Sequence, residues 1–315
     1  MLYDRRDASI SLRELALGSD CSPEGLEAAL NCLCGRGHRI QISPDGLARL
    51  KQPIALDEGL IQRGLAAGRI GRHVICFGEV GSTNDVAFDS ARQADSDGLV
   101  VLAESQTSGR GRIGRTWHGE PMSNIMMSVL LLDDRQELHL GALTVAGGVA
   151  VAEGIDEYVG LPTRLKWPND VLLDGKKVSG VLTEARRIAG RQAVVVGMGI
   201  NVNSCPPPEQ VARPATCIAS EAGHLVERTE LIRAVISRLE CWVRQIVQGR
   251  GEGLHKAWAS RCDMIGTRTT VVCSQRQYTG RVLDISPLDE LVLAQDDGQC
   301  VTLPAKGSTF LDGKC

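Results

Sequence analysis

Arginine and glycine are concentrated in one short segment of the sequence, SGRGRIGRTW at residues 108 to 117, where three glycines and three arginines lie between Gly109 and Arg115. Glycine lets the backbone approach a ligand closely, and an arginine side chain binds phosphate or carboxylate through two parallel hydrogen bonds. The segment lies between two apolar runs and ends at Trp117, so both its ends are held. We therefore expect a loop that closes over an anionic ligand, with a plain solvated loop or a nucleic-acid-binding segment as the alternatives.

Part of this segment, GRGRIG, also matches the GxGxxG pattern of dinucleotide-binding domains. In those domains the third glycine lies inside a helix whose first turn meets the pyrophosphate. Here the next residues, RTWHGEPMS, contain a glycine and a proline before the following apolar run, which leaves no room for that helix. No GxxxxGK segment followed by serine or threonine occurs either. The sequence therefore argues against a dinucleotide-binding fold and against a P-loop.

A second cluster, KWPND at residues 166 to 170, joins two apolar segments. Pro168 has no backbone N–H to donate and interrupts the path of a sheet, which would hold Lys166 in a fixed place at the end of a strand. Because side chains alternate along a strand, Arg164 and Lys166 are expected on one face. Taken alone, the same pattern also fits a charged edge of a sheet, so its meaning depends on the other clusters.

The elements that must position these clusters alternate along the middle of the chain. Asp174-Gly175 between two apolar runs is typical of a two-residue hairpin, so at least one pair of strands should be antiparallel. We predict an α+β fold with a central mixed or antiparallel sheet and flanking helices. The expected strands cover residues 73–80, 98–105, 124–132, 163–167, 170–174, 177–185 and 193–202, and the expected helices cover residues 57–68, 83–93, 139–158 and 228–248.

The two ends of the chain differ in pattern from this middle part. Residues 1 to 50 predict a small helical unit, with one helix that begins at Ser22-Pro23-Glu24 and a short hairpin that turns at Pro44-Asp45-Gly46. The last fifty residues are short apolar runs separated by turn residues, which is typical of a small β-barrel. We therefore expect three parts in the chain.

Composition argues against several classes of protein. The 315 residues carry a formal net charge of -3, so nothing draws the whole chain to nucleic acid or to an acidic membrane, and a cationic site must be local. The apolar runs are too short for a membrane helix and no secretion signal is recognised, which favours a cytoplasmic protein without a membrane partner. The 11 cysteines include no CxxC pair and the six histidines no HExxH, so we expect reduced thiols and no zinc site.

The order of the clusters resembles that of the biotin protein ligases. Ser82-Thr83-Asn84 follows a predicted strand, GRGRIGR and KWPND come next, and GMGINVN at residues 197 to 203 resembles the late strand of that family. Gln106 stands where the family places a glutamine that contacts biotin. The resemblance runs from about residue 70 to the end of the chain, and the joint match is far more specific than any one motif.

This resemblance implies a domain organisation. It comprises a catalytic domain of the class II aminoacyl-tRNA synthetase type, a C-terminal SH3-like barrel and a degenerate N-terminal winged-helix-like unit. The three domains would cover residues 65–265, 266–315 and 1–55, respectively. The helix that would read DNA in the N-terminal unit carries Glu24 and Glu27 and is basic only at Arg36, whereas such helices normally present basic and amide groups. DNA is therefore not a favoured partner.

The resemblance also implies a reaction. The family activates biotin with ATP to biotinyl-5′-adenylate, releases pyrophosphate, and transfers the biotinyl group to a lysine of a biotin carboxyl carrier domain. The attacking carboxylate meets a polyanionic nucleotide, and two unit charges about 4 Å apart repel by roughly 4 kcal/mol at an effective dielectric of about 20. Fixed cations and Mg²⁺ would offset that repulsion. A bifunctional ligase that also represses transcription and a lipoate-type acyl-protein ligase stay open as alternatives.

Site residues follow from the resemblance position by position. Lys166 and Arg112 would be catalytic, with Lys166 as the fixed cation beside the biotin carboxyl group and the α-phosphate. The biotin site would comprise Ser82, Thr83, Asn84, Gln106, Arg110, Gly111, Arg112, Lys166 and Gly180. The nucleotide site would comprise Gly109, Arg112, Arg115, Trp117, Lys166, Asn169 and Asn201.

Two of these positions have a second interpretation. The Ser82 turn would also cap the helix that follows it. Gly180 would either let a ligand ring approach the sheet or form a simple bulge. No Met-Lys-Met segment occurs in the chain, so the acceptor lysine is expected on the carrier domain of another protein, a carboxylase. A homodimer is left open.

Overall fold

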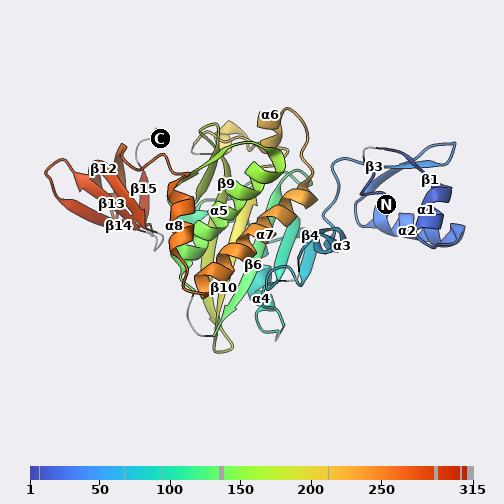
Figure 1. Ribbon diagram of the computed structural model, residues 1–315, viewed down its shortest axis with the longest axis horizontal. Coiled ribbons are helices and arrows are strands. Elements are labelled where there is room, and N and C mark those ends of the chain that lie inside the picture. Colours follow the sequence, from blue (N-terminus) through green and yellow to red (C-terminus); the bar gives the residue numbers. More distant parts are fainter. Residues whose placement is uncertain are drawn as a thin grey trace. The chain divides into compact units, whose positions relative to one another are not determined.

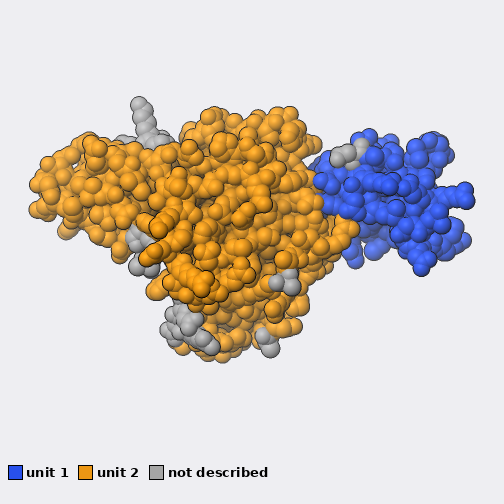
Figure 2. Space-filling model, in the orientation of Figure 1, with its two compact units in different colours: residues 1–57 blue, residues 58–315 orange. Residues whose placement is uncertain are grey.

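The computed structural model describes residues 1–6, 8–66, 68–93, 95–134, 138–211, 213–286, 290–305 and 307–310. The chain forms two compact units, residues 1–57 and residues 58–315, which are coloured separately in Figure 2. Each unit has its own sheet and its own buried apolar side chains. Within the described part of the chain, no helix is both long enough and apolar enough to cross a membrane.

The first unit combines two helices with a small antiparallel sheet. Its elements are β1 (Ile10–Ser11), α1 (Leu12–Gly18), α2 (Pro23–Gly35), β2 (Arg39–Ile42) and β3 (Leu47–Lys51), and the sheet order is β1-β3-β2. Both helices begin after a serine: Ser11 Oγ accepts from the backbone N–H of Glu14, and Ser22 Oγ accepts from that of Gly25, each at 3.1 Å. These bonds satisfy donors that a helix leaves unpaired in its first turn. The predicted helix start at Ser22 and the predicted hairpin are confirmed.

The core of the first unit is formed by a few side chains from all its layers. The buried residues of this cluster are Ile10, Leu15, Leu26, Leu30 and Ala48. Burying a leucine or isoleucine side chain contributes about 1.5–3 kcal/mol relative to leaving it in water. This small cluster holds α1 and α2 against the sheet.

The second unit is built on a seven-stranded sheet. Its strands are β4 (Val74–Val80), β5 (Val100–Gln106), β6 (Ile125–Asp133), β7 (Thr163–Lys166), β8 (Asp170–Leu173), β9 (Lys176–Ile188) and β10 (Arg191–Ile200). They lie in the order β4-β5-β6-β10-β9-β8-β7, and only the pair β4 and β5 among these is parallel. The predicted α+β fold with a mixed central sheet is confirmed, and all seven predicted strands lie close to their expected bounds.

The connection between β8 and β9 is the hairpin that the sequence predicts. Asp174 and Gly175 form the turn, with φ angles of 49° and 71°. A two-residue hairpin of this kind needs positive φ at both central residues, which Asp tolerates and Gly adopts readily. The turn sets the register in which Lys176 pairs with Leu173.

Helices lie on both faces of the central sheet. The α-helices of the second unit, in the described part of the chain, are α3 (Glu58–Arg63), α4 (Thr83–Ser90), α5 (Leu140–Val159), α6 (Ile218–Ala222), α7 (Arg228–Val247) and α8 (Glu252–Ala259). Figure 1 shows α5, α7 and α8 together on one face. Gly147 of α5 approaches Val196, whereas α4 packs against Val195, and consecutive strand residues point to opposite faces. The helix expected over residues 57–68 is shorter, because α3 ends before Gly64 and glycine is a poor helix former.

The last part of the second unit is a separate antiparallel sheet. Its strands are β11 (Arg268–Cys273), β12 (Arg276–Ser286), β13 (Glu290–Gln295), β14 (Cys300–Pro304) and β15 (Ser308–Phe310), in the order β14-β13-β12-β11-β15. Val271, Val282 and Leu293 point to its buried side. The predicted run of short strands is confirmed, and β15 is an additional strand that the sequence did not predict.

Candidate active site

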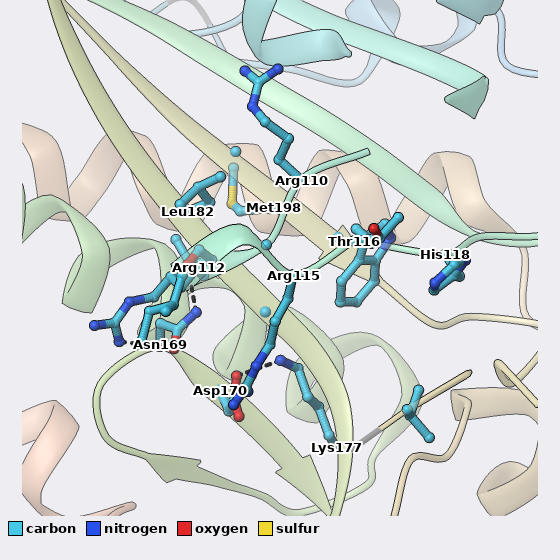
Figure 3. A pocket seen from close by; sticks show the side chains of 18 of the residues that line it. Arg110, Arg112, Arg115, Thr116, His118, Asn169, Asp170, Lys177, Leu182 and Met198 are labelled. Atoms are coloured by element: carbon cyan, nitrogen blue, oxygen red, sulfur yellow. Dashed lines mark hydrogen bonds and ion pairs between the residues drawn. The ribbon is translucent and has the colours of Figure 1, made fainter. Parts of the chain in front are cut away.

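A cavity of about 440 Å³ lies where β5 ends and the last residues of β10 pass beside β9. Its wall also includes the hairpin of residues 109–117 and the KWPND corner (Figure 3). The predicted site residues that line it are Ser82, Thr83, Asn84, Gln106, Arg110, Gly111, Arg112, Arg115, Trp117, Asn169, Gly180 and Asn201. Gly109 and Lys166 are not among the lining residues. The structure thus brings together segments that are far apart in sequence.

One end of the cavity carries polar groups without net charge: Ser82, Thr83, Asn84 and Gln106, with Ser128 buried behind them. We call this the neutral end. The backbone N–H and the hydroxyl of Thr83 both donate to Gln106 Oε1, at 2.7 and 3.0 Å. Ser128 Oγ lies 2.7 Å from Thr83 Oγ1 and 2.6 Å from Asn84 Oδ1. These mutual hydrogen bonds fix the positions of the polar groups before a ligand arrives.

The predicted cap at Ser82 needs a correction. Ser82 occupies the position before α4, but its side chain makes no capping hydrogen bond. Gln106 at the end of β5 takes that role, because its Oε1 accepts from the backbone N–H of Thr83 in the first turn. The Ser82 hydroxyl is therefore not committed to the helix, and Ser82 remains a lining residue of the cavity.

Two glycines of β10 make room for cavity side chains. A Cβ atom on Gly197 would lie 2.4 Å from Asn84 Oδ1, and one on Gly199 would lie 2.2 Å from the Trp117 ring. Real Cβ atoms do not approach other atoms so closely, so any side chain here would displace Asn84 or Trp117. GMGINVN resembles a strand of the family, but the resemblance assigned these two glycines no role. Their alternation with Met198, which places both on one face of β10, was the available signal.

The loop expected at residues 109–117 is a tight hairpin. Arg110 and Thr116 form an isolated antiparallel bridge, and the backbone N–H of Trp117 donates to Gly109 O at 3.0 Å. The backbone N–H of Gly111 donates to Arg115 O at 2.6 Å. These bonds bring the arginine side chains to the edge of the cavity on a defined backbone.

Within this hairpin, Arg110 and Arg112 point in different directions (Figure 3). Arg110 Nη1 donates to Asp85 Oδ2 at 2.6 Å and Arg110 Nη2 donates to Asp85 Oδ1 at 3.0 Å. The hydrogen bonds that Arg110 donates to Asp85 lower the pKa of Asp85 and raise the pKa of Arg110. Arg112 instead reaches Asn169, with 3.4 Å between Nη1 and Oδ1, and donates to the carbonyl oxygen of Ala305. Arg112 is therefore the arginine that connects the hairpin to the KWPND corner.

The opposite end of the cavity is cationic. We call Arg112, Arg115 and Lys177, together with Asp170, the cationic end. Lys177 Nζ lies 2.6 Å from Asp170 Oδ1 and 5.9 Å from the centroid of the Trp117 ring. Figure 3 shows Arg115 pointing toward Asp170 and Lys177. Asp170 is the only acidic side chain among the described lining residues, so positive charge exceeds negative charge here.

Sequence reasoning missed Lys177. The sequence signal for Lys177 was its position just after the β8–β9 turn, on the strand that pairs with the KWPND corner. The register that pairs Asp170 with Gly180 brings Lys177 Nζ to 3.0 Å from where a Gly180 Cβ would lie. Gly180 also pairs regularly with Gly199, and the register shift in β9 falls between the partners of Val171 and Leu172. The interpretation of Gly180 as a simple bulge is therefore wrong.

Lys166 lies behind the cavity wall. Lys166 is 5% exposed and is not among the lining residues. Its Nζ lies 5.8 Å from the centroid of the ring of Phe310, which does line the cavity. Trp167 packs edge-on against the same ring, with 5.8 Å between centroids and 81° between planes. Arg164 is exposed and pairs with Asp263. The alternative interpretation, in which these residues form a charged edge of the sheet, therefore fits the exposed Arg164 and does not fit the buried Lys166.

Three residues that line the cavity have a buried polar atom without a hydrogen-bond partner among the residues that the structure describes. The three atoms are Trp117 Nε1, Trp167 Nε1 and Asn201 Oδ1. An unpaired buried donor or acceptor costs about 1–3 kcal/mol, so a ligand or water that satisfies these atoms would be favoured here.

Fold and site together define a class: an α+β domain whose cavity has a neutral polar end and a cationic end beside an arginine-rich hairpin. The model of the biotin/lipoate A/B protein ligase family matches residues 77–201. The bifunctional ligase/repressor BirA of Bacillus subtilis is 30% identical over 293 residues, which are 92% of this chain and 90% of that protein. The biotin–[acetyl-CoA-carboxylase] ligase of Mycobacterium tuberculosis is 35% identical over 71% of this chain and 83% of its own length.

A solved structure agrees with these relatives. The biotin protein ligase of Aquifex aeolicus in complex with biotin and ATP matches with a TM-score of 0.66 and 27% identity, over 76% of this chain and 98% of that chain. The relationship thus extends well beyond the stretch matched by the family model. The chain belongs to the biotin/lipoate A/B protein ligase family.

Proposed function

We propose that the protein is a biotin protein ligase that activates biotin with ATP to biotinyl-5′-adenylate and transfers the biotinyl group to a lysine of a biotin carboxyl carrier domain. The observation that carries the proposal is the division of one cavity into a neutral end and a cationic end, in a chain whose relatives along most of its length are biotin ligases. A lipoate-type ligase stays a weaker alternative, because the named relatives and the structural neighbour are biotin ligases.

The neutral end suits the ring system of biotin. Biotin is largely apolar and carries one polar ureido group, so its pocket needs a few fixed donors and acceptors between apolar walls. Ser82, Asn84 and Gln106 supply such groups, and Met126 and Met198 are among the apolar lining residues. The hydrogen bonds between the polar groups reduce the entropy that binding must overcome.

The cationic end suits the phosphates and the biotin carboxylate. In the first step a carboxylate oxygen attacks the α-phosphorus, a new C–O–P linkage forms, and pyrophosphate leaves with the electrons of the broken P–O bond. Negative charge increases on the phosphoryl oxygens during this displacement, and fixed donors in a water-poor site stabilise it strongly. Arg112, Arg115 and Lys177 are the donors at this end, and Trp117, Asn169 and Asn201 would complete the nucleotide site.

Lys166 keeps its proposed catalytic role with one condition. Lys166 is buried beside the Phe310 ring and is not among the lining residues, so it would reach a ligand only after the cavity wall rearranges. Nucleotide entry would supply that rearrangement. The electrostatic role does not require a proton transfer, because the ammonium group acts as a fixed charge.

The proposal includes Mg²⁺ bound together with the nucleotide. Mg²⁺ prefers oxygen ligands and often keeps several waters while it binds substrate phosphates through one or two carboxylates. In the described residues no group of three or more histidine, cysteine or acidic side chains could hold a metal ion, and Asp170 is the one carboxylate that lines the cavity. This donor set fits an ion held mainly by the phosphates, with Asp170 beside it. Mg²⁺ would supply neutralisation of phosphate charge.

The remaining parts of the chain have proposed identities as well. We propose a winged-helix-like unit at residues 1–55, a catalytic domain of the class II aminoacyl-tRNA synthetase type at residues 65–265 and an SH3-like barrel at residues 266–315. The three-stranded sheet with two helices and the five-stranded antiparallel sheet support the first and the last assignment. The acceptor lysine would lie on a biotin-dependent carboxylase.

Transcription repression is a second candidate function with one observation in its favour. The Bacillus subtilis relative is named a ligase/repressor, and its alignment covers 92% of this chain, which must include part of residues 1–57. Against it, α2 presents exposed Glu24 and Glu27. Hydrogen bonds at the start of α2 lower the pKa of Glu24, so this carboxylate stays charged near phosphates. A salt-dependent gel shift with the upstream region of its gene tests this function, and unshifted DNA would contradict it.

The activation step is tested by pyrophosphate exchange. Full-length protein, ATP, Mg²⁺ and labelled pyrophosphate should yield labelled ATP when biotin is present. Lipoate in place of biotin should give little exchange. Exchange that is independent of biotin, or stronger with lipoate, would contradict the proposed substrate.

A further inference from the structure

We propose that Asp85 and Glu184 form a carboxylate clasp that holds the Arg110 side chain and thereby keeps the hairpin of residues 109–117 closed over the cavity. In this account Asp85 and Glu184 are positioning residues that act on the ligand through the hairpin. Arg110 is the anchor of the hairpin, which leaves Arg112 and Arg115 to meet anionic groups. The consequence for adenylate retention rests on the proposed function, whereas the clasp itself does not.

The clasp consists of three hydrogen bonds that one guanidinium group donates to two carboxylates. Two join Arg110 to Asp85 in a bidentate arrangement, at 2.6 and 3.0 Å. The third joins Arg110 Nη2 to Glu184 Oε2 at 3.2 Å. Bidentate pairs between arginine and carboxylate fix orientation as well as distance. The positive charge of Arg110 is thus matched by two carboxylates, whereas Asp170 is the only acidic side chain among the described residues that line the cavity with Arg112 and Arg115.

The two carboxylates are attached to rigid elements, whereas the hairpin is rich in glycine. Asp85 lies in the first turn of α4, where a negative charge is favoured by the helix dipole. Glu184 lies in the middle of β9 and pairs with Val195 of β10. Arg186 Nη2 donates to Asp85 Oδ1 at 2.9 Å, and its guanidinium group lies 4.1 Å from the centroid of Phe88. Asp85 is therefore held from two sides and can serve as a fixed point.

Glu184 also connects the clasp to the neutral end of the cavity. Its Oε2 accepts a hydrogen bond from Asn84 Nδ2 at 2.6 Å, on the same oxygen that Arg110 contacts. Asn84 Oδ1 in turn lies 2.6 Å from Ser128 Oγ. One carboxylate oxygen therefore joins a biotin-side amide to the hairpin. Two sites that share such a group are coupled, and the coupling acts in both directions.

The first test needs no ligand and no activity. Asp85→Asn removes one of the two negative charges of the clasp and keeps the side-chain shape. Trypsin cleavage after Arg110, Arg112 and Arg115, identified by mass spectrometry on the native full chain, reports how often the hairpin opens. We expect these bonds to be cut roughly fivefold faster in Asp85→Asn than in the unmodified protein, because a bidentate charged contact is lost.

The matched control is Asp134→Asn. Asp134 binds Arg191 through two hydrogen bonds of 2.7 and 3.0 Å, so its pair has the same chemistry as Asp85 with Arg110. Neither Asp134 nor Arg191 lines the cavity. The control should leave cleavage of the hairpin unchanged. Equal cleavage in the Asp85 and Asp134 variants would overturn the clasp. Should Asp85→Asn prove globally unfolded by thermal denaturation, Arg110→Lys, which cannot form the bidentate pair, should show the same faster cleavage after Arg112 and Arg115.

The second test measures what the clasp does for the ligand. Release of labelled biotinyl-adenylate should be roughly fivefold faster from Asp85→Asn and unchanged for Asp134→Asn. Glu184→Gln should also raise the KM for biotin with a smaller change in kcat, because Glu184 orients Asn84. A protein that forms no adenylate at all would contradict the proposed function and leave the proteolysis result intact. Unchanged release with faster cleavage would overturn the link between the clasp and retention.

Discussion

At the neutral end of the cavity, polar side chains hydrogen-bond one another, whereas at the cationic end positive groups face the cavity with little compensating charge. Thr83, Gln106 and Ser128 are already satisfied by neighbours before any ligand binds. Arg115 and Lys177 share one acidic neighbour, Asp170, among the described lining residues. The neutral end is therefore built for shape and hydrogen-bond recognition of a small molecule. The cationic end is built to stabilise negative charge that grows during a reaction.

This difference indicates which end should control which kinetic step. Changes at the cationic end should act mainly on the chemical step, because fixed charges matter most where charge develops. Changes at the neutral end should act mainly on the affinity for biotin. The two ends meet at the hairpin of residues 109–117, so variants there should affect the lifetime of the bound intermediate.

The largest effect is expected for Lys166→Ala. Removal of a fixed group that stabilises a transition state costs roughly 100-fold to 1,000-fold in rate. We expect a loss of this size in kcat for adenylate formation, with a smaller change in the KM for biotin, measured by pyrophosphate exchange. Lys176→Ala is the matched control, because Lys176 is a neighbouring lysine that pairs with Glu221 outside the cavity. Rates of Lys166→Ala close to those of the control would remove Lys166 from the mechanism.

The next largest effect is expected for Arg112→Ala. Arg112 joins the hairpin to Asn169 and to the carbonyl oxygen of Ala305, so its loss weakens closure and removes a cation together. Release of the adenylate should become about tenfold faster, since a charge-assisted hydrogen bond contributes about 1.5–3 kcal/mol. The measurement is a chase of labelled adenylate with excess unlabelled biotin. Unchanged retention would show that the hairpin does not close over the intermediate.

A smaller effect is expected for Asn84→Ala. The change removes the amide that lies between Ser128 and Glu184 and leaves both without one partner. A lost neutral hydrogen bond costs about 1 kcal/mol, which corresponds to roughly fivefold in binding. The KM for biotin should rise by this factor while kcat changes little. A fall in kcat with constant KM would move Asn84 from recognition to the chemical step.

The smallest effect is expected from pH. Hydrogen bonds from Arg110 and Arg186 lower the pKa of Asp85 below its ordinary 3.8. A carboxyl group whose pKa is lower in the folded protein than in the unfolded chain stabilises the fold at pH values above its unfolded pKa. This stabilisation is lost as the pH falls through the pKa of the folded protein. The measurement is the protection of the hairpin amides from hydrogen exchange in the unmodified protein, divided by their protection in Asp85→Asn. This ratio should therefore stay constant from about pH 8 to about pH 5. A ratio that falls within that window would show that another group controls the hairpin.

The local motifs of the site were predictable because their residues are neighbours in sequence. Gly and Arg in GRGRIGR define a loop with fixed cations, and Pro168 with Asp174-Gly175 defines where the strands around Lys166 turn. The alternation of apolar and polar positions likewise indicated the strands of the central sheet. For these features, local backbone preferences and the final fold agree.

Other features depend on register between distant elements, which the sequence does not state. Lys177 reaches Asp170 only because β8 and β9 pair in one register, and Arg110 meets Glu184 only because β9 passes beside the hairpin. Phe310 lies beside Lys166 because it belongs to β15, a strand that was not predicted at all. The cap of α4 by Gln106 rather than Ser82 has the same origin, since the nearer side chain was the natural expectation.

The central claim is tested most directly by ATP-dependent transfer of biotin to a carrier. The full-length protein, labelled biotin, ATP, Mg²⁺ and a biotin carboxyl carrier domain are incubated, and the label on the carrier is located by peptide mapping. We predict label on one lysine of the carrier, none without ATP and far less when lipoate replaces biotin. Absence of label on the carrier, or preferential transfer of lipoate, would contradict the account.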